Sequence, residues 1–395
     1  MKSHSYLIVT GDFVPTGGMD RANLALARYL ADRPETASEV HLVAHRATED
    51  LANLPRVRFH RVPRPLGSHW LAGPLLDRAG RRLARTIRPA CVVVNGGNCR
   101  TSLAAANWVH YLHACWSPSD HQAFRPPWHR RLKHTLAHRQ FLNEERTALD
   151  RSPVIIANSR LTAAHIGSHY PHLSDRVRVV YYGTDADRFG PVPPAERCAG
   201  RAALGLADDR PTVLFVGALG DARKGFDILF DAWVILKTRR DWDAQLLVAG
   251  AGASVAHYER LAREKSLGDS IAFLGFRNDI PNILAASDLL VSPVRYEAYG
   301  LNVHEALCRE IPVLVSADSG IAERLDDDTH EGGQAWMKLP NPVDAASLAE
   351  SLRHWRGRSD AYRYAARAAG SRLRSASWDD RMTEFVGNLS YDRCS

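Results

Sequence analysis

The sequence predicts an α/β protein built from two doubly wound domains, and three observations support that prediction. Short apolar runs alternate with amphipathic helical patterns along the chain, which is typical of parallel strands joined by crossover helices. This alternation pauses at a proline-rich segment, DRFGPVPPAERC at 187–198, which reads as a linker, and then restarts. The length of 395 residues also favours two domains over one or four.

The first half contains seven runs that we expect to be strands, at 5–11, 40–44, 57–62, 91–95, 108–113, 153–158 and 177–182. Amphipathic patterns at 21–33 and 75–87 predict helices between them. We therefore assign residues 1–188 to an N-terminal domain with a parallel sheet.

The second half repeats this design. Strands are expected at 212–217, 244–250, 271–275, 288–293 and 312–316, with helices near 225–239, 255–266 and 302–309. We assign residues 189–375 to a C-terminal domain and 376–395 to a helix that packs back on the N-terminal domain. Two such domains joined by a hinge are expected to enclose a cleft, because open α/β sheets bind ligands beyond the carboxyl ends of their strands.

Composition excludes several classes of protein. No run approaches 18 apolar residues, so no membrane-spanning helix is predicted, and the first residues do not resemble a signal peptide. The six cysteines include no C-x-x-C pair, which argues against a disulfide framework and a zinc site. We predict no bound metal and expect a cytoplasmic protein.

Charge is divided unevenly along the chain. Residues 1–188 hold 26 Lys and Arg against 15 Asp and Glu, whereas the remainder holds 25 against 29. The basic half is interpreted either as an ordinary solvated surface or as a half that meets an anionic partner such as a membrane face.

Several catalytic motifs are missing. No G-x-G-x-x-G follows a strand, no P-loop lysine motif is present, and neither G-x-S-x-G nor H-E-x-x-H occurs. Dinucleotide binding, P-loop ATP hydrolysis, a hydrolase nucleophile elbow and zincin chemistry are therefore not supported.

The most informative segment is EAYGLNVHE, from Glu297 to Glu305, directly after the expected strand at 288–293. The backbone amides of Gly300, Leu301 and Asn302 would open a helix there, and a helix N-terminus is a ready phosphate site. Glu305, about one turn later, could accept hydrogen bonds from a vicinal diol such as a ribose. The same spacing also fits a solvated loop glutamate followed by a helix-dipole partner.

Two further loops carry chemistry at strand ends. Arg223 and Lys224 follow the strand at 212–217 and precede Gly225, so a lysine charge and a close backbone approach could serve a diphosphate. Gly17 and Gly18 lie between the first strand and the first helix, where they could approach phosphate or sugar. Each loop could equally be an ordinary tight turn.

One histidine is singled out in WVHYLHACWSP at 108–118. Strand alternation places His110 on one face and His113 on the other, and His113 would end the strand at the ligand-binding edge. A structural role for this histidine is the alternative.

Taken together, these segments resemble the retaining GT-B glycosyltransferases of glycosyltransferase family 4. The features that match are the E-x7-E of Glu297 and Glu305, Lys224 in its loop, the Gly17-Gly18 pair and a strand-end histidine. The resemblance implies a GT-B fold, with two Rossmann-like domains facing a central cleft, and a nucleotide-diphospho-sugar donor, most simply a UDP- or GDP-sugar. No other cofactor would be required.

The resemblance also implies roles for individual residues. Glu305 would hold the ribose, Lys224 the diphosphate, and the amides from Gly300 to Asn302 a phosphate, with Phe276 and Arg277 flanking the base. Glu297 and His113 would contact the donor sugar, and Gly17 and Gly18 would line the diphosphate and the acceptor side. The family often has an arginine directly after the glycine of the first strand in the second domain. Ala218 stands at that position, and we expect Arg223 to replace the missing arginine.

The predicted function is retaining transfer of a hexose to a glycan, lipid-linked or small-molecule acceptor of the cell envelope or of secondary metabolism. A nucleotide-sugar 2-epimerase and a non-catalytic nucleotide-sugar-binding protein are the alternatives. No nucleic-acid partner is expected. The segment 125–151 combines seven basic residues with Trp128, Leu132, Leu136 and Phe141 at near-helical spacing. This pattern favours peripheral binding to an anionic inner membrane face, or else an apolar stripe that packs on the sheet with a soluble acceptor.

Overall fold

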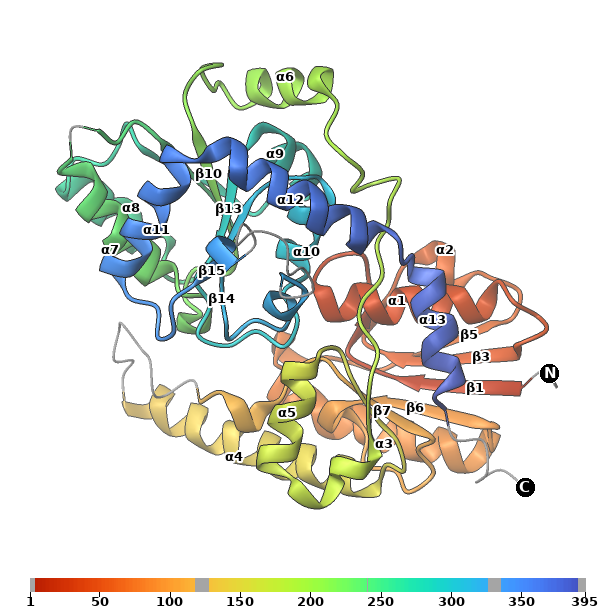
Figure 1. The fold of residues 1–395 in the computed structure, drawn as a ribbon. Coiled ribbons are helices and arrows are strands. Elements are labelled where there is room, and N and C mark those ends of the chain that lie inside the picture. The colour runs from red at the N-terminus through yellow and green to blue at the C-terminus, as the bar shows by residue number, and fades with distance from the viewer. Residues whose placement is uncertain (1–3, 118–127, 240, 326–334, 390–395) are drawn as a thin grey trace. The chain divides into compact units, whose positions relative to one another are not determined.

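The computed structural model describes residues 4–117, 128–239, 241–325 and 335–389, and it divides into two compact units. The first unit contains the described residues up to 182 together with the helix that starts at Trp378. The second unit contains the described residues from 183 to 377. Each unit is built around one parallel sheet (Figure 1).

The sheet of the first unit has seven strands, all paired in parallel. Their order across the sheet is β5 (Val57–Arg61), β3 (Ala37–Ala44), β1 (His4–Val9), β6 (Cys91–Asn95), β7 (Ala106–Val109), β8 (Ile155–Ala157) and β9 (Val177–Val179). A two-stranded pair, β2 (Asp12–Phe13) with β4 (Arg46–Ala47), follows the carboxyl ends of β1 and β3. The strand order reverses between β1 and β6, which is the topological switch point of a doubly wound fold.

The α-helices among the described residues of this unit are α1 (Gly18–Ala31), α2 (Glu49–Ala52), α3 (His69–Ile87), α4 (Trp128–Arg151), α5 (Arg160–His169) and α13 (Trp378–Gly387). The last of these is C-terminal in sequence but packs on α1 (Figure 1). The Tyr29 hydroxyl lies 2.9 Å from that of Thr383, and the Phe385 ring packs on Trp108 with 4.6 Å between centroids. The C-terminal helix is thus part of the first unit's core.

The second unit has six parallel strands. Their order is β12 (Ile271–Gly275), β11 (Gln245–Ala249), β10 (Thr212–Val216), β13 (Leu289–Ser292), β14 (Val313–Ser316) and β15 (Lys338–Leu339). Its helices are α6 (Pro194–Ala203), α7 (Phe226–Lys237), α8 (Val255–Glu264), α9 (Ile280–Ala286), α10 (Leu301–Cys308), α11 (Ala345–Gly357) and α12 (Ser359–Arg374). Figure 1 shows α7, α8 and α11 on one face of the sheet and α9, α10 and α12 on the other.

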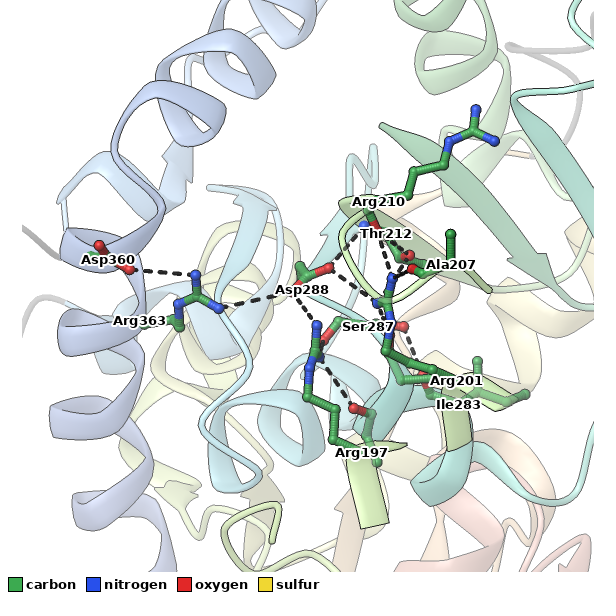
Figure 2. Close-up of polar contacts among 12 residues, drawn as sticks. Arg197, Arg201, Ala207, Arg210, Thr212, Ile283, Ser287, Asp288, Asp360 and Arg363 are labelled. Atoms are coloured by element: carbon green, nitrogen blue, oxygen red, sulfur yellow. Dashed lines mark hydrogen bonds and ion pairs between the residues drawn. The ribbon is translucent and has the colours of Figure 1, made fainter. Parts of the chain in front are cut away.

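An ionic cluster fastens this second unit at the amino edge of its sheet (Figure 2). The carboxylate of Asp288, which directly precedes β13, accepts a hydrogen bond from the Arg197 guanidinium of α6 at 2.6 Å. It accepts a second from the backbone N–H of Thr212 in β10 at 2.9 Å. Arg201, only 3% exposed, lies 3.5 Å from the same carboxylate. The cluster ties α6 to two central strands at the edge opposite the carboxyl ends of the strands.

Two sequence predictions were wrong in detail. The segment 187–198 is not wholly a linker, because α6 begins at Pro194, and proline suits the first position of a helix. The strand expected at 108–113 is β7 at Ala106–Val109, so the chain leaves the sheet before His110. A helix thus begins inside the predicted linker, and the strand ends inside the segment predicted to be wholly strand.

Candidate functional site

The candidate site of the second unit lies at the carboxyl edge of its sheet, where β10 and β13 are neighbours and the strand order reverses. Ligands of open α/β sheets bind in the crevice at such a switch point. The loop after β10 carries Arg223 and Lys224, and the loop after β13 carries Glu297 and Gly300. The fold therefore brings together the two segments that the sequence singled out as most informative.

Glu297 lies between two cations from the β10 loop. Its Oε2 pairs with the ammonium of Lys224 and lies 3.3 Å from Nη1 of Arg223. Arg223 also donates to the Tyr296 carbonyl at 3.2 Å and to Asp221 at 3.2 Å. The three charged side chains are between 14% and 21% exposed, so they form a compact and largely buried cluster.

The charge state of Glu297 follows from these neighbours. Burial alone would raise its pKa, but the charges and hydrogen bonds of Lys224 and Arg223 outweigh burial and hold the pKa below its ordinary range. Its backbone is fixed as well, since its N–H donates to Asp318 at 2.8 Å and its carbonyl accepts from Gly320 at 3.0 Å. Glu297 is therefore an ionised, positioned carboxylate at neutral pH.

Two glycines allow the loops to come this close. Gly225 has φ of 68°, and a Cβ there would lie 1.8 Å from the Pro293 carbonyl oxygen. Gly300 has φ of 102°, and a Cβ there would lie 2.6 Å from Ser319 Oγ. A side chain at Gly225 would push the β10 loop away from the end of β13, and a side chain at Gly300 would push the start of α10 away from Ser319, which follows β14.

Gly300 caps α10, so the backbone N–H groups of Leu301 and Asn302 belong to the first turn, which has no intrahelical acceptor. The Asn302 side chain donates to the carbonyl of Val216 at 3.2 Å, which ties this turn to the last residue of β10. Glu305 is the fifth residue of α10 and is only 6% exposed. A helix N-terminus, a lysine and a second carboxylate thus share one sheet edge.

Phe276 and Arg277 follow β12, two strands away from β10 along the same edge. Phe276 is 66% exposed, which leaves its ring face open. Arg277 makes a two-pronged pair with Asp279, at 2.7 and 2.5 Å, and this pair raises the pKa of the arginine. Arg277 is therefore held by its own loop rather than by the β10–β13 cluster.

In the first unit, Gly17 immediately precedes α1 and Gly18 is its first residue, both after the carboxyl end of β1. His113 opens a short 3₁₀ turn, η3 (His113–Cys115), beyond the end of β7. Burial, and secondarily the charge of His138, lowers the pKa of His113 to about 4, so its imidazole is neutral at physiological pH.

His110 lies in the core, in contrast to the partly exposed His113. His110 Nδ1 lies 2.5 Å from the Tyr182 hydroxyl, its ring packs on Trp108, and burial lowers its pKa to about 3. This arrangement gives His110 a packing role, and His113 is the histidine left at the edge of the sheet.

A polar cluster at the carboxyl edge of the first sheet was not predicted from the sequence. Asp12, after β1, accepts from Arg46, after β3, at 2.6 Å, and lies 3.6 Å from Arg64, after β5. Asp20, in the first turn of α1, has its pKa raised to about 7 by burial and then by the nearby Asp12. A signal in the sequence was available, because Asp12, Arg46 and Arg64 each lie within two residues of the end of a predicted strand.

Two negative findings apply to the described residues. Within 4–117, 128–239, 241–325 and 335–389, no three His, Cys, Asp or Glu side chains gather so that they could hold a metal ion. Across the same part of the chain, no helix is both long and apolar enough to cross a membrane.

Comparison with known proteins gives two family matches that follow the two units. Residues 16–188 match the family model described as Glycosyltransferase Family 4, and residues 198–369 match that described as Glycosyl transferases group 1. A lipopolysaccharide core biosynthesis mannosyltransferase, LpsB of Rhizobium meliloti, is 33% identical over 206 residues, which are 50% of this chain and 55% of the relative. An alpha-D-kanosaminyltransferase of Streptomyces kanamyceticus is 30% identical over 188 residues, 45% of this chain and 48% of the relative. The chain thus spans about half the length of the curated relatives it matches.

Solved structures share the fold over nearly the whole chain. WaaG, a glycosyltransferase involved in lipopolysaccharide biosynthesis, superimposes with a TM-score of 0.76 at 20% identity, covering 98% of this chain and 99% of that one. HepE of Anabaena, solved in complex with UDP and glucose, has a TM-score of 0.69 at 18% identity, covering 98% and 100%. Together with the two parallel sheets of this chain, this likeness confirms the α/β prediction of two Rossmann-like domains of the GT-B type.

Proposed function

The chain belongs to glycosyltransferase family 4, and from that premise we propose that it is a retaining hexosyltransferase. It moves a hexose from a nucleotide-diphospho-sugar to a cell-envelope glycan, a lipid-linked acceptor or a small-molecule acceptor. The observation that carries the proposal is the cluster of Arg223, Lys224 and Glu297 beside the N-terminus of α10. The two cations of this cluster can hold a dianionic leaving group, and its carboxylate can hold the hydroxyls of a sugar.

Each group has a distinct task in the proposal. Lys224 and Arg223 bind the diphosphate, with Arg223 supplying the guanidinium that Ala218 cannot, and the amides from Gly300 to Asn302 bind a phosphate oxygen. Glu305 accepts hydrogen bonds from the ribose hydroxyls. These contacts stabilise the negative charge that grows on the diphosphate as the glycosidic bond breaks, which is where preorganised donors contribute most.

Glu297 holds hydroxyls of the donor sugar. Because it is ionised and fixed by two cations, it can orient those hydroxyls without itself transferring a proton. His113 contacts the donor sugar, and Gly17 and Gly18 line the diphosphate and acceptor side, as the family resemblance implies. Phe276, with its open ring face, and Arg277 flank the base.

Retention of configuration is proposed to arise by attack on the same face that the diphosphate leaves, with a diphosphate oxygen accepting the acceptor's proton. No side chain is assigned as a covalent nucleophile. The donor is a UDP- or GDP-sugar, and a neighbour solved with UDP and glucose favours UDP as the first candidate.

Peripheral membrane contact is proposed for the first unit. Leu132 and Leu136 of α4 are 53% and 47% exposed, and Leu71 and Leu75 of α3 are 42% and 39% exposed. The Lys133 ammonium lies 6.0 Å from the Trp70 ring, which brings the starts of α3 and α4 together. Exposed leucines beside basic residues are typical of helices that lie at an anionic lipid interface.

The test is a screen of UDP-, GDP-, ADP- and TDP-sugars in which nucleoside diphosphate release and the anomeric configuration of the sugar product are both followed. The proposal predicts one preferred nucleotide and a product with the donor's anomeric configuration. An epimerised nucleotide sugar formed without acceptor identifies the epimerase alternative, and an inverted anomer contradicts the retaining mechanism.

A further inference from the structure

The turn that carries His113 is held by a helix rather than by its own strand. β7 ends at Val109, and η3 begins at His113. The backbone N–H of His113 donates to Oε2 of Glu145 at 2.6 Å, and the N–H of Ala114 donates to Oε1 at 3.2 Å. One carboxylate of α4 therefore accepts from the first two amides of the turn.

Glu145 is buried more deeply than an ordinary surface glutamate. It is 1% exposed, and Oε1 accepts a third hydrogen bond from the Tyr170 hydroxyl at 3.0 Å. Burial raises its pKa to about 7, against the opposing effect of the His113, Tyr170 and Ala114 hydrogen bonds. A buried carboxylate is unfavourable unless its oxygens are satisfied, and here two of its three donors belong to the His113 turn.

The same face of α4 also holds the histidine ring. Phe141 lies one helical turn before Glu145, so both side chains project in the same direction. Its ring stacks on the His113 imidazole with 5.0 Å between centroids and 26° between planes. The Tyr111 ring meets the same imidazole edge-on, with 4.9 Å between centroids. The backbone and the ring of His113 are thus both fixed by contacts from this side of the first unit.

We propose that Glu145 is a positioning residue for His113, fixing the place of the imidazole by accepting from the two amides that open η3. The proposal rests on the proposed function, because that function alone gives His113 a substrate. Glu145 itself touches no substrate and is not a catalytic residue.

The geometry explains why a carboxylate is needed rather than any polar group. The His113 amide uses one oxygen, and the Ala114 amide and the Tyr170 hydroxyl use the other. A glutamine has one oxygen, and its amino group would face a backbone N–H, so at least one of the two turn bonds would be lost. Glu145→Gln therefore perturbs the turn while keeping the size of the side chain.

The experiment compares wild type with Glu145→Gln by two readouts. The first is the pKa of the His113 imidazole, followed by NMR of selectively labelled histidine. The second is turnover with the preferred nucleotide sugar, together with the affinity for its nucleoside diphosphate. We expect the His113 pKa to rise from about 4 toward its ordinary value of 6.5 as the turn loosens. Turnover should fall roughly 10²-fold, the loss typical of a reacting group displaced by about 1 Å, with unchanged nucleotide affinity.

A matched control lies next to Glu145 on the same helix. Glu144 is also buried, but its carboxylate accepts from the Gln140 side chain at 2.9 Å rather than from η3. Glu144→Gln should leave both the His113 pKa and turnover at their wild-type values. If Glu145→Gln does not fold, Phe141→Leu removes the stacked ring instead and should move both readouts in the same direction.

An unchanged His113 pKa in a folded Glu145→Gln protein would overturn the proposal, and so would unchanged turnover in that protein when His113→Ala lowers turnover. Failure of the proposed function has a different signature. If His113→Ala retains wild-type turnover, His113 has no part in transfer, while the NMR readout still decides whether Glu145 holds the turn.

Discussion

Replacing Lys224 by alanine should weaken binding of a nucleoside diphosphate much more than binding of the corresponding monophosphate. In the free protein the Lys224 ammonium pairs with Glu297 and is 21% exposed, so a bound diphosphate must share it with that carboxylate. Two unit charges 4 Å apart attract by about 4 kcal/mol at an effective dielectric of 20. This figure is an upper limit, because the Lys224 ammonium already pairs with Glu297 in the free protein. A net loss of about 1.5–3 kcal/mol, typical of hydrogen bonds to charged groups, corresponds to roughly 10- to 150-fold in affinity.

Isothermal titration calorimetry with UDP and UMP, or with GDP and GMP, measures this difference directly. Monophosphate affinity should change by only about threefold or less, because it lacks the β-phosphate and more distant charges are screened within about 8 Å. Lys224→Arg keeps the charge and should recover part of the loss. Lys237→Ala, at the exposed far end of α7, should change neither affinity. Equal losses for the diphosphate and the monophosphate would refute the assignment of Lys224 to the diphosphate.

Four further predictions follow from the same site and surface. Glu305→Ala should weaken binding of nucleotide alone by about 10- to 150-fold in calorimetry, and unchanged affinity would remove Glu305 from the ribose. His113→Ala should lower turnover by about 10²–10³ with little change in donor affinity, the pattern expected when a group acts on the reacting sugar, and kinetics with the preferred donor measure both. Glu297 has a lowered pKa, so its ion pair stabilises the fold above the ordinary glutamate pKa of 4.5 and is lost as the pH falls through the lower, folded value. Glu297→Gln should therefore have a lower free energy of unfolding in urea than wild type at pH 7, and the difference should shrink as the pH falls below 4.5. Finally, vesicles of anionic lipid should sediment the protein at low salt but not at high salt, and Leu132→Ser with Leu136→Ser should reduce the bound fraction, since the expected attraction is about 1 kcal/mol per basic residue.

The sequence predicted the strands well because most are buried on both faces. Such strands read as continuous apolar runs, and CVVVN at 91–95 is β6 with the same bounds. The error at 108–113 has a physical cause. WVHYLH alternates like a strand, but the His110 ring turns into the core against Trp108 and Tyr182, so the chain leaves the sheet.

The candidate site was predictable only in part. Glu297 and Lys224 are 73 residues apart, and their pairing follows from strand order, which places β10 beside β13. The basic segment 125–151 was expected to present one apolar stripe with Phe141 in it. The structure instead exposes Leu132 and Leu136 and stacks Phe141 on His113, while the Trp128 side chain lies outside what the structure describes. Glu145 carries no local signal at all, since its partner amides lie more than 30 residues earlier.

Hydrogen exchange in the presence of saturating UDP, GDP, ADP or TDP tests the central claim most directly, because it reports where a nucleotide binds as well as whether it binds. Ligand at 100 times its dissociation constant stabilises the bound state by about 2.7 kcal/mol, enough to slow local exchange clearly. The account predicts that one of these nucleotides protects the loop after β10, around Lys224, and the segment from Glu297 into α10. The amino edge of the same sheet, around Asp288, should exchange as in the free protein. Protection confined to that amino edge, or no protection by any of the four nucleotides, would contradict a donor site at the β10–β13 switch point.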